Sequence, residues 1–218
     1  MPLRIFLPFI VATFLSASVA HAGSASRVVS VPALGVRGEG LPGVVNYILI
    51  QFERTTAQDG PIVQFNEINL GGGSLVGEEW KEGVRRAVQA VTRIVGDEGH
   101  DWLITVKNRS MTALTDGASA SAAVAVGIMA AYNGDAIGSD VAVSGQITPD
   151  GRLDVVGGLP VKIEAASSAH YRTIIVARDQ MLTPDWMLSN EVAARRRIHL
   201  IQAGTLEEAY QAMTGKSR

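Results

Sequence analysis

The segment formed by residues 119–132 constrains the fold more than any other part of the sequence. It is rich in alanine and apolar at almost every position, so as a helix it has no polar face to turn towards water. A helix of this kind is buried, and other elements must surround it. The chain contains no cysteine, so packing rather than disulfide bonds must hold the surrounding elements against this helix.

The first half of the chain predicts two strands and a helix. Residues 44–54 and 62–70 are β-rich and flank the turn sequence Asp59-Gly60-Pro61, which indicates a strand pair or a long hairpin. Residues 78–95 carry apolar side chains at helical spacing. Glu78 and Glu79 suit the start of this helix, where the helix dipole favours acidic side chains.

The second half of the chain interleaves strands and helices. We expect strands at 102–106, 141–147, 153–156, 173–177 and 198–202, and helices at 119–132, 160–169, 184–189 and 206–213. The two strands that flank Asp150-Gly151 form a hairpin. Because hairpins occur among the alternating elements, the pattern favours an α+β fold over a doubly wound sheet.

Residues 1–22 have the features of a secretory signal peptide. Arg4 precedes an apolar stretch at 5–15, and Ala20-His21-Ala22 supplies the small residues of a cleavage site. The stretch is about half of the ~20 residues that a membrane-spanning helix needs. We therefore expect cleavage after Ala22, export to the periplasm or the outside of the cell, no stable membrane anchor, and one domain at 23–218. An uncleaved anchor is the alternative.

The charge balance excludes one class of partner. The chain has 19 Lys and Arg against 21 Asp and Glu, a net charge of −2, which does not predict nucleic-acid binding. The absence of cysteine also excludes a thiol nucleophile. The sequence assigns no cofactor and no metal site.

Ser119 is the candidate nucleophile. It lies in the motif Asp116-Gly117-Ala118-Ser119-Ala120-Ser121, where a loop becomes a helix and backbone N–H groups at the positive helix end can stabilise an oxyanion. A serine hydroxyl needs a base to attack a carbonyl group. The histidines outside the signal peptide, His100, His170 and His199, fit structural positions better than a catalytic one.

Lys162 is the stronger candidate for that base. Small and apolar residues flank it in the segment 157–166, GGLPVKIEAA, and could bury its amine and so lower its pKa. The residues alone leave a second interpretation open, because alanine-rich helices are usually just tightly packed and a lysine after Gly157-Gly158 is usually solvated.

Three segments, in the same order, resemble the proteolytic domain of Lon (S16) proteases. They are Asp116-Gly117-Ala118-Ser119-Ala120, residues 140–148 (DVAVSGQIT) and residues 151–166 (GRLDVVGGLPVKIEAA). The family typically has D-G-P-S-A-G, D-V-A-M-T-G-E-I-T and G-G-L-x-x-K-x-x-A-A. The resemblance implies the Lon proteolytic domain type of fold, which is ribosomal protein S5 domain 2-like, with mixed sheets packed with helices.

The resemblance also implies roles for four residues. Ser119 would be the nucleophile and Lys162 the general base of a serine-lysine dyad. Ser144 aligns with a threonine that orients the lysine, and Asp116 matches an acidic residue before the nucleophile. The implied activity is a serine endopeptidase that cuts peptides or unfolded proteins without ATP.

Departures from the family pattern keep two alternatives open. Ala118 replaces a proline, Ser121 a glycine and Ser144 a threonine. A binding or scaffold protein that keeps the fold without catalysis is the first alternative. A serine esterase with a histidine base is the second. The sequence leaves homo-oligomer formation open.

Overall fold

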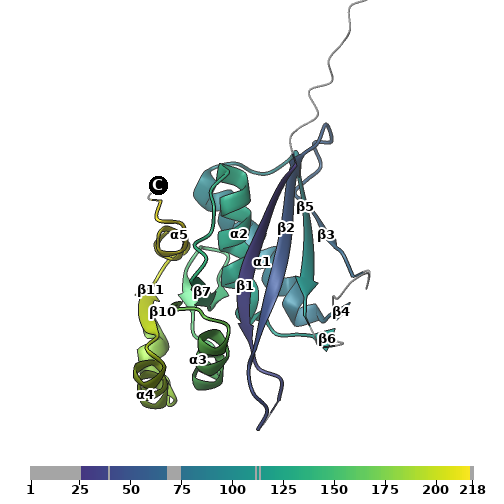
Figure 1. The fold of residues 1–218 in the computed structure, drawn as a ribbon. Coiled ribbons are helices and arrows are strands. Elements are labelled where there is room, and N and C mark those ends of the chain that lie inside the picture. Colours follow the sequence, from purple (N-terminus) through teal and green to yellow (C-terminus); the bar gives the residue numbers. More distant parts are fainter. Residues whose placement is uncertain (1–25, 39, 68–74, 111, 113, 217–218) are drawn as a thin grey trace, which may run out of the picture.

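The computed structural model describes residues 26–38, 40–67, 75–110, 112 and 114–216 (Figure 1). The signal peptide predicted at 1–22 lies outside the described residues, as does the end of the strand predicted at 62–70.

The elements are distributed along the whole described chain. The strands are β1 (Arg27–Gly35), β2 (Val44–Arg54), β3 (Ile62–Phe65), β4 (Leu75–Val76), β5 (Trp102–Arg109), β6 (Leu114–Thr115), β7 (Val141–Ser144), β8 (Gln146–Ile147), β9 (Leu153–Asp154), β10 (Thr173–Ala177) and β11 (His199–Ala203). The α-helices are α1 (Glu78–Val95), α2 (Ser121–Asn133), α3 (Leu159–Ser168), α4 (Trp186–Arg196) and α5 (Leu206–Thr214). Two 3₁₀ turns are η1 (Ala118–Ala120) and η2 (Arg178–Leu182).

Seven strands form one mixed sheet in the order β11-β10-β7-β1-β2-β5-β3. Strands β1, β2 and β5 are antiparallel neighbours, whereas β7, β10 and β11 run parallel to one another. The predicted α+β fold, with a mixed sheet packed with helices, is therefore confirmed. Two further pairs, β4 with β6 and β8 with β9, lie outside this sheet.

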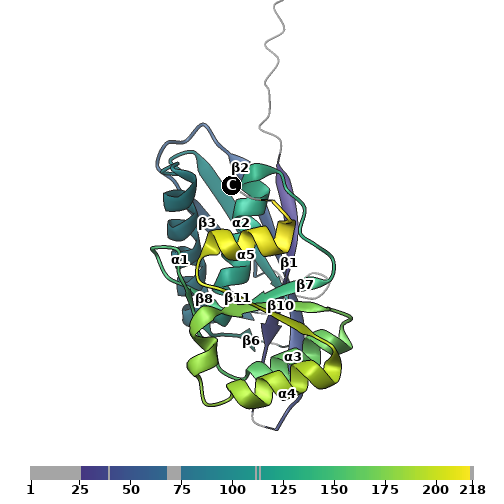
Figure 2. The same ribbon diagram turned by 90° about the vertical axis from the view of Figure 1, so that its left-hand side faces the viewer.

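Helices cover the sheet on both faces and create two hydrophobic cores. Helices α1, α2 and α5 pack into one core, and α3 and α4 into the other. Figure 2 shows α5 lying across α2, with α3 and α4 beside β10 and β11. None of the helices in the described part of the chain is sufficiently long and apolar to cross a membrane.

Helix α2 is the buried helix that the alanine-rich segment predicts. All of its residues from 121 to 131 are buried. Gly127 faces strands β1 and β2 so closely that a Cβ atom would lie 2.4 Å from Ile50 Cδ1 and 2.5 Å from Val31 Cγ2. Small residues are thus what allows the helix to lie against the sheet.

Several predicted elements are confirmed, and two predictions need correction. Strand β2 and helix α1 have the predicted bounds, but α4 begins at Trp186 and runs seven residues past the helix expected at 184–189. The hairpin predicted for β2 and β3 is wrong, because β5 lies between them and pairs with both. The chain reaches β5 from β3 through α1, so this segment is a parallel crossover rather than a hairpin.

Strand β1 is an element that the sequence analysis did not predict. It pairs antiparallel with β2 over its full length and touches β7 through Ala33 and Val143. Pro32 lies within it, and a proline in a run normally argues against an interior strand. Its position joins the antiparallel half of the sheet to the parallel half.

Candidate active site

Ser119 lies in the 3₁₀ turn η1, directly before α2. Gly117 enters this turn with a φ of 95°, a conformation that L side chains rarely adopt. The carbonyl oxygen of Ser119 accepts a hydrogen bond from the Gly145 N–H at 3.3 Å, and the Ala122 N–H donates to the Gly145 carbonyl at 3.2 Å. The candidate nucleophile is therefore tied to the residue that follows β7.

Asp116 anchors the nucleophile turn to helix α1. Its Oδ1 accepts hydrogen bonds from the Trp80 N–H at 3.0 Å and from the Gly117 N–H at 2.9 Å. Gly77, the residue at the start of α1, has no side chain to cap the helix, and a Cβ there would lie 2.1 Å from Asp116 Cγ. Asp116 thus takes the capping role from another part of the chain.

Ser121 has a structural role in the same turn. Its buried Oγ accepts a hydrogen bond from the Ile147 N–H at 2.9 Å, which joins the start of α2 to β8. A Cβ on Gly83 of α1 would lie 3.2 Å from Ser121 Cβ. The departure from the family glycine therefore adds a contact that holds this turn.

Lys162 is buried in the first turn of α3, with 2% of its surface exposed. Burial removes water from the ammonium form and lowers the pKa of Lys162 to about 8, although the charge of Asp185 opposes part of this change. A substantial fraction of the amine is therefore neutral near pH 8. The burial expected from the flanking residues is observed.

Ser144 is fully buried, and its Oγ has no hydrogen-bond partner among the described residues. It alternates on β7 with Val143, so it points to the same face as Ala142, which packs with Leu159 and Ile163 of α3. Ser144 thus faces the layer that carries Lys162, while its neighbour Gly145 contacts Ser119. The end of β7 therefore connects the turn of Ser119 to the layer of α3.

A family model for the Lon protease (S16) C-terminal proteolytic domain matches residues 97–207. This range is about half of the chain and includes Asp116, Ser119, Ser144 and Lys162. The chain belongs to this family. The order and character of the motifs that suggested a Lon domain are thus supported by an independent comparison.

Two curated relatives are named archaeal Lon proteases. The protein of Thermococcus kodakarensis is 31% identical over 114 residues, which cover 50% of this chain and 18% of the relative. The protein of Pyrococcus abyssi is 27% identical over 140 residues, which cover 62% of this chain and 13% of the relative. The chain therefore spans less than a fifth of the length of either relative.

Two cavities lie near the candidate residues of this Lon domain, and Lys162 lines neither of them. One, of about 140 Å³, is lined by Ser119 and Asp116 together with two buried amides, Asn46 and Asn108. The other, of about 1230 Å³, is mostly apolar and runs along the outside of α3. Val36 and Val44 line both cavities, so the two meet at the loop between β1 and β2.

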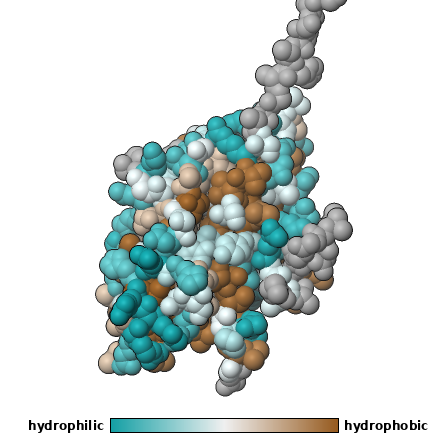
Figure 3. All heavy atoms as spheres, viewed as in Figure 1, coloured by the Kyte–Doolittle hydropathy of each residue, from teal (hydrophilic) through white to brown (hydrophobic). Residues whose placement is uncertain are grey.

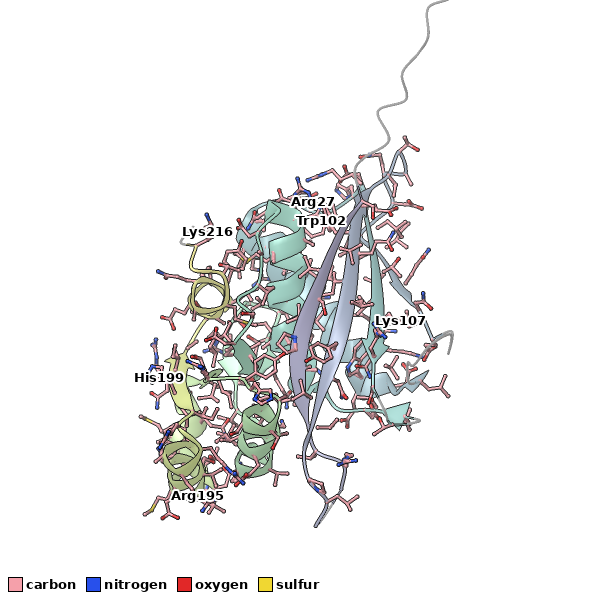
Figure 4. The ribbon with its side chains drawn as sticks, viewed as in Figure 1. Arg27, Trp102, Lys107, Arg195, His199 and Lys216 are labelled. Atoms are coloured by element: carbon pink, nitrogen blue, oxygen red, sulfur yellow. The ribbon has the colours of Figure 1, made fainter. Side chains whose placement is uncertain are left out.

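The described histidines are absent from the lining of both cavities, although His170 follows Ala169, which lines the larger one. His100, His170 and His199 are exposed, and none of them lines either cavity in the described part of the chain. His100 contacts Glu98 at 2.7 Å, and Figure 4 shows His199 on the outer edge of the sheet in β11. Within the described ranges, the alternative of a histidine base thus has no histidine in the lining of the cavity that includes Ser119.

Gln180 is a further polar residue of the site region that the sequence analysis missed. It is fully buried in η2, its Nε2 donates to the Val156 carbonyl at 2.9 Å, and its Oε1 accepts from the Val156 N–H at 3.0 Å. This pair fixes the segment that leads through Gly157 and Gly158 into α3. A polar residue shortly after an apolar strand was the only signal for it.

Proposed function

We propose that this chain is a serine endopeptidase in which Ser119 is the nucleophile and Lys162 the general base. The observation that carries the proposal is a lysine buried to 2% exposure, with its pKa lowered to about 8, in a Lon proteolytic domain. A buried amine without a function is costly, because its charged form loses hydration. Perturbed groups of this kind cluster at functional sites.

The proposed reaction proceeds through an acyl-enzyme. Neutral Lys162 Nζ takes the proton of Ser119 Oγ, and the oxygen attacks the peptide carbonyl to form a tetrahedral intermediate. The resulting ammonium group then protonates the leaving amine as the C–N bond breaks. Water hydrolyses the ester after Lys162 takes one of its protons, and the returned proton restores Ser119.

Backbone N–H groups near the start of α2 could stabilise the developing oxyanion. The backbone N–H of Ser119 is the donor we propose, because it lies at the N-terminal end of a buried helix where the dipole favours negative charge. The N–H groups of Ser121 and Ala122 are less suitable, since they donate to the carbonyls of Ala118 and Gly145.

Ser144 and Asp116 are proposed as positioning residues. The Ser144 hydroxyl has an unused hydrogen-bonding capacity in the layer of Lys162, which suits a group that orients the amine. Asp116 holds the nucleophile turn against α1 through the Trp80 N–H. Neither side chain needs to exchange a proton with the substrate in this scheme.

The substrates we propose are peptides and already unfolded proteins, cut without ATP. The large apolar cavity beside α3 supports this, because it is open to an extended chain and includes the half-exposed side chains of Leu41 and Tyr47. On the side of the molecule viewed in Figure 1, Figure 3 shows hydrophobic side chains gathered in the middle, over β1 and β2. We also propose that the protein is exported and that its signal peptide is removed after Ala22.

The direct test is cleavage of unfolded casein and of a peptide library without nucleotide. We expect cleavage by the wild type and none by Ser119→Ala or by Lys162→Arg, in which no neutral base is accessible. Activity retained in Lys162→Arg would contradict the lysine base, whereas loss of activity in His170→Ala or His199→Ala would favour an esterase-like histidine base. A wild type that cuts nothing would favour a scaffold.

N-terminal sequencing tests the proposed export. The sequence of the exported protein should begin at Gly23.

A further inference from the structure

Two buried amides occupy positions where the apolar rows of the sheet end beside Ser119. On β2, Ile50 and Ile48 point into the core under α2, and the next residue on that face is Asn46. On β5, Val106 is followed on the same face by Asn108, while Lys107 points to the opposite side (Figure 4). Both amides are buried, with 6% and 3% of their surfaces exposed.

The strand register places the two amides close together. Asn108 is paired with Ile48 across β2 and β5, so Asn46, two residues from Ile48, is its diagonal neighbour on the same face. Elsewhere these rows hold isoleucine, valine, phenylalanine and tryptophan. The change to amides occurs at the end of the sheet where α2 begins.

The amides line the cavity of about 140 Å³ together with Ser119 and Thr112. Asn46 Oδ1 is buried and has no hydrogen-bond partner among the described residues. Because a buried acceptor without a donor is unfavourable, water or a ligand must supply the donor when the cavity is filled. The volume holds about four water molecules or one side chain of medium size.

We propose that this cavity is a specificity pocket for an uncharged amide side chain, glutamine or asparagine, on the residue that supplies the attacked carbonyl. The proposal rests on the peptidase function above. Asn46 Oδ1 accepts from the substrate amide N–H, with Asn108 lying beside it. Ser119 lines the same cavity, so the side chain nearest to the attacked carbonyl is the one that enters.

The lining favours an amide over a charged or an apolar side chain. An ammonium or guanidinium group would lose water at the buried end, where the amides carry no net charge. The charged residues of the lining, Asp116 and Arg37, are both exposed rather than at the buried end. Asp116 Oδ1 already accepts two backbone N–H groups, and Arg37 Nε donates to the Pro42 carbonyl at 3.1 Å. A carboxylate would therefore lose water at the buried end without gaining a buried cation. An apolar side chain would fill the space but leave Asn46 Oδ1 without a donor.

Asn46 lies outside residues 97–207, the part of the chain that matches the Lon family model. The candidate nucleophile and base lie inside that range. The part of the wall that Asn46 supplies therefore comes from β2, a strand that the match does not cover, whereas Asn108 lies inside the matched range. A preference particular to this chain can arise at Asn46.

The test is cleavage of four peptides that differ only at the residue before the cut bond, which is Gln, Met, Glu or Lys. Methionine has nearly the length of glutamine without its hydrogen bonds. We expect kcat/KM for the Gln peptide to exceed the others by about tenfold to a hundredfold. Asn46→Leu should remove this preference and favour Met, whereas Asn190→Leu, the same change on the exposed side of α4, should not alter it. Asn46→Ser serves if Asn46→Leu does not fold by circular dichroism.

The outcomes separate this proposal from the proposed function. Equal cleavage of the Gln and Met peptides by the wild type, or a preference unchanged in Asn46→Leu, would overturn the pocket and leave the peptidase standing. If the wild type cuts no peptide, the proposed function fails. Binding of acetyl-glutamine amide then tests whether the cavity still accepts an amide side chain. A shift of the Asn46 side-chain NH₂ signals in NMR would support the pocket, and no shift would overturn it.

Discussion

The Gly145 N–H donates to the carbonyl oxygen of Ser119 at 3.3 Å. Through this bond the turn that carries the candidate nucleophile is joined to the end of β7, one residue after Ser144. Because Ser144 points to the face of α3 and Ser119 precedes α2 on the other face, the end of β7, an interior strand, is where the two layers meet. A small change at Ser144 should therefore affect the reaction more than the fold.

Ser144→Ala is expected to lower kcat about tenfold, the equivalent of one hydrogen bond to Lys162. The hydroxyl has no partner among the described residues, so its removal should leave the free energy of unfolding unchanged or slightly raised. The measurements are kcat on one peptide and urea unfolding, with Ser168→Ala at the exposed end of α3 as the control. Unchanged kcat in Ser144→Ala would contradict a role in orienting the lysine.

Lys162→Met should stabilise the protein at pH 7 while abolishing cleavage. The pKa of Lys162 falls from 10.5 to about 8 on folding, and each pKa unit corresponds to ~1.4 kcal/mol. The folded state therefore binds fewer protons than the unfolded state between these values, and wild-type stability rises with pH across that window. Below pH 8 burial of Lys162 costs about 3 kcal/mol, which the methionine variant avoids.

Urea unfolding of both proteins at pH 7 and at pH 10 tests this expectation. The stability advantage of Lys162→Met should be largest at pH 7 and small at pH 10, because most lysine is then neutral in the folded state and partly neutral in the unfolded state. Other titrating groups are common to both proteins and cancel in the difference. An advantage of equal size at both pH values would show that burial of charge is not its cause.

Gln180→Met should destabilise the fold by about 2 kcal/mol or more. The variant keeps the volume of the side chain but leaves the N–H and the carbonyl of Val156 without their partner in a buried position. Since Val156 leads into α3, kcat should fall as well. Chemical unfolding and peptide cleavage measure the two effects, and Gln64→Met on the exposed part of β3 is the control. If Gln180→Met were as stable as the wild type, the two hydrogen bonds between Gln180 and the Val156 backbone would not stabilise the fold.

The sequence predicted correctly those elements in which the spacing of apolar residues directly reflects which face is buried. The helix at 78–95 and the strand at 44–54 have the predicted bounds, because each carries a regular apolar period over many residues. For this helix and this strand, neighbours in sequence decide the environment. The small and apolar neighbours of Lys162 allowed its burial but left a solvated lysine open, and the structure decides for burial.

Features set by distant parts of the chain were not predictable in this way. Strand β5 enters between β2 and β3 only after the chain has passed through α1, and nothing local to β2 records this. Pro32 obscured β1. The burial of Gln180 and Asn46 depends on other segments of the chain, such as Val156 for Gln180, so their own sequence neighbours did not single out these two polar residues.

Gly127→Ala is expected to destabilise the protein by about 1–2 kcal/mol although alanine is the better helix former. The added Cβ would lie within 2.5 Å of side-chain atoms of Val31 and Ile50, both fully buried. Thermal or urea unfolding measures the change. Gly157→Ala is a matched control, because nothing lies within 4 Å of a Cβ at that position, and it should be near neutral. Equal stability of the two variants would mean that α2 can move away from the sheet.

The pH dependence of cleavage distinguishes a lysine base from a histidine base. Lys162 must lose its proton before it can accept one from Ser119, and its pKa is about 8. We therefore expect kcat/KM to rise about tenfold per pH unit below pH 8 and to level off above it. A histidine base has an ordinary pKa of ~6.5, so its profile would already be flat at pH 8. A wild-type plateau complete by pH 7 would contradict the lysine base.

Asp185→Asn should shift the midpoint of this profile to lower pH. The negative charge of Asp185 raises the pKa of Lys162 against the larger effect of burial, so removing the charge leaves burial less opposed. Asparagine keeps an oxygen that can accept the hydrogen bond from Thr183 Oγ1, which Asp185 accepts at 2.7 Å, so the start of α4 should remain in place. Asp179→Asn, an exposed change in η2, should leave the midpoint unmoved. The measurement is kcat/KM against pH for the three proteins on one peptide. Because a purely structural role for Asp185 would alter the rate without moving the midpoint, the direction of the shift identifies Lys162 as the group that titrates.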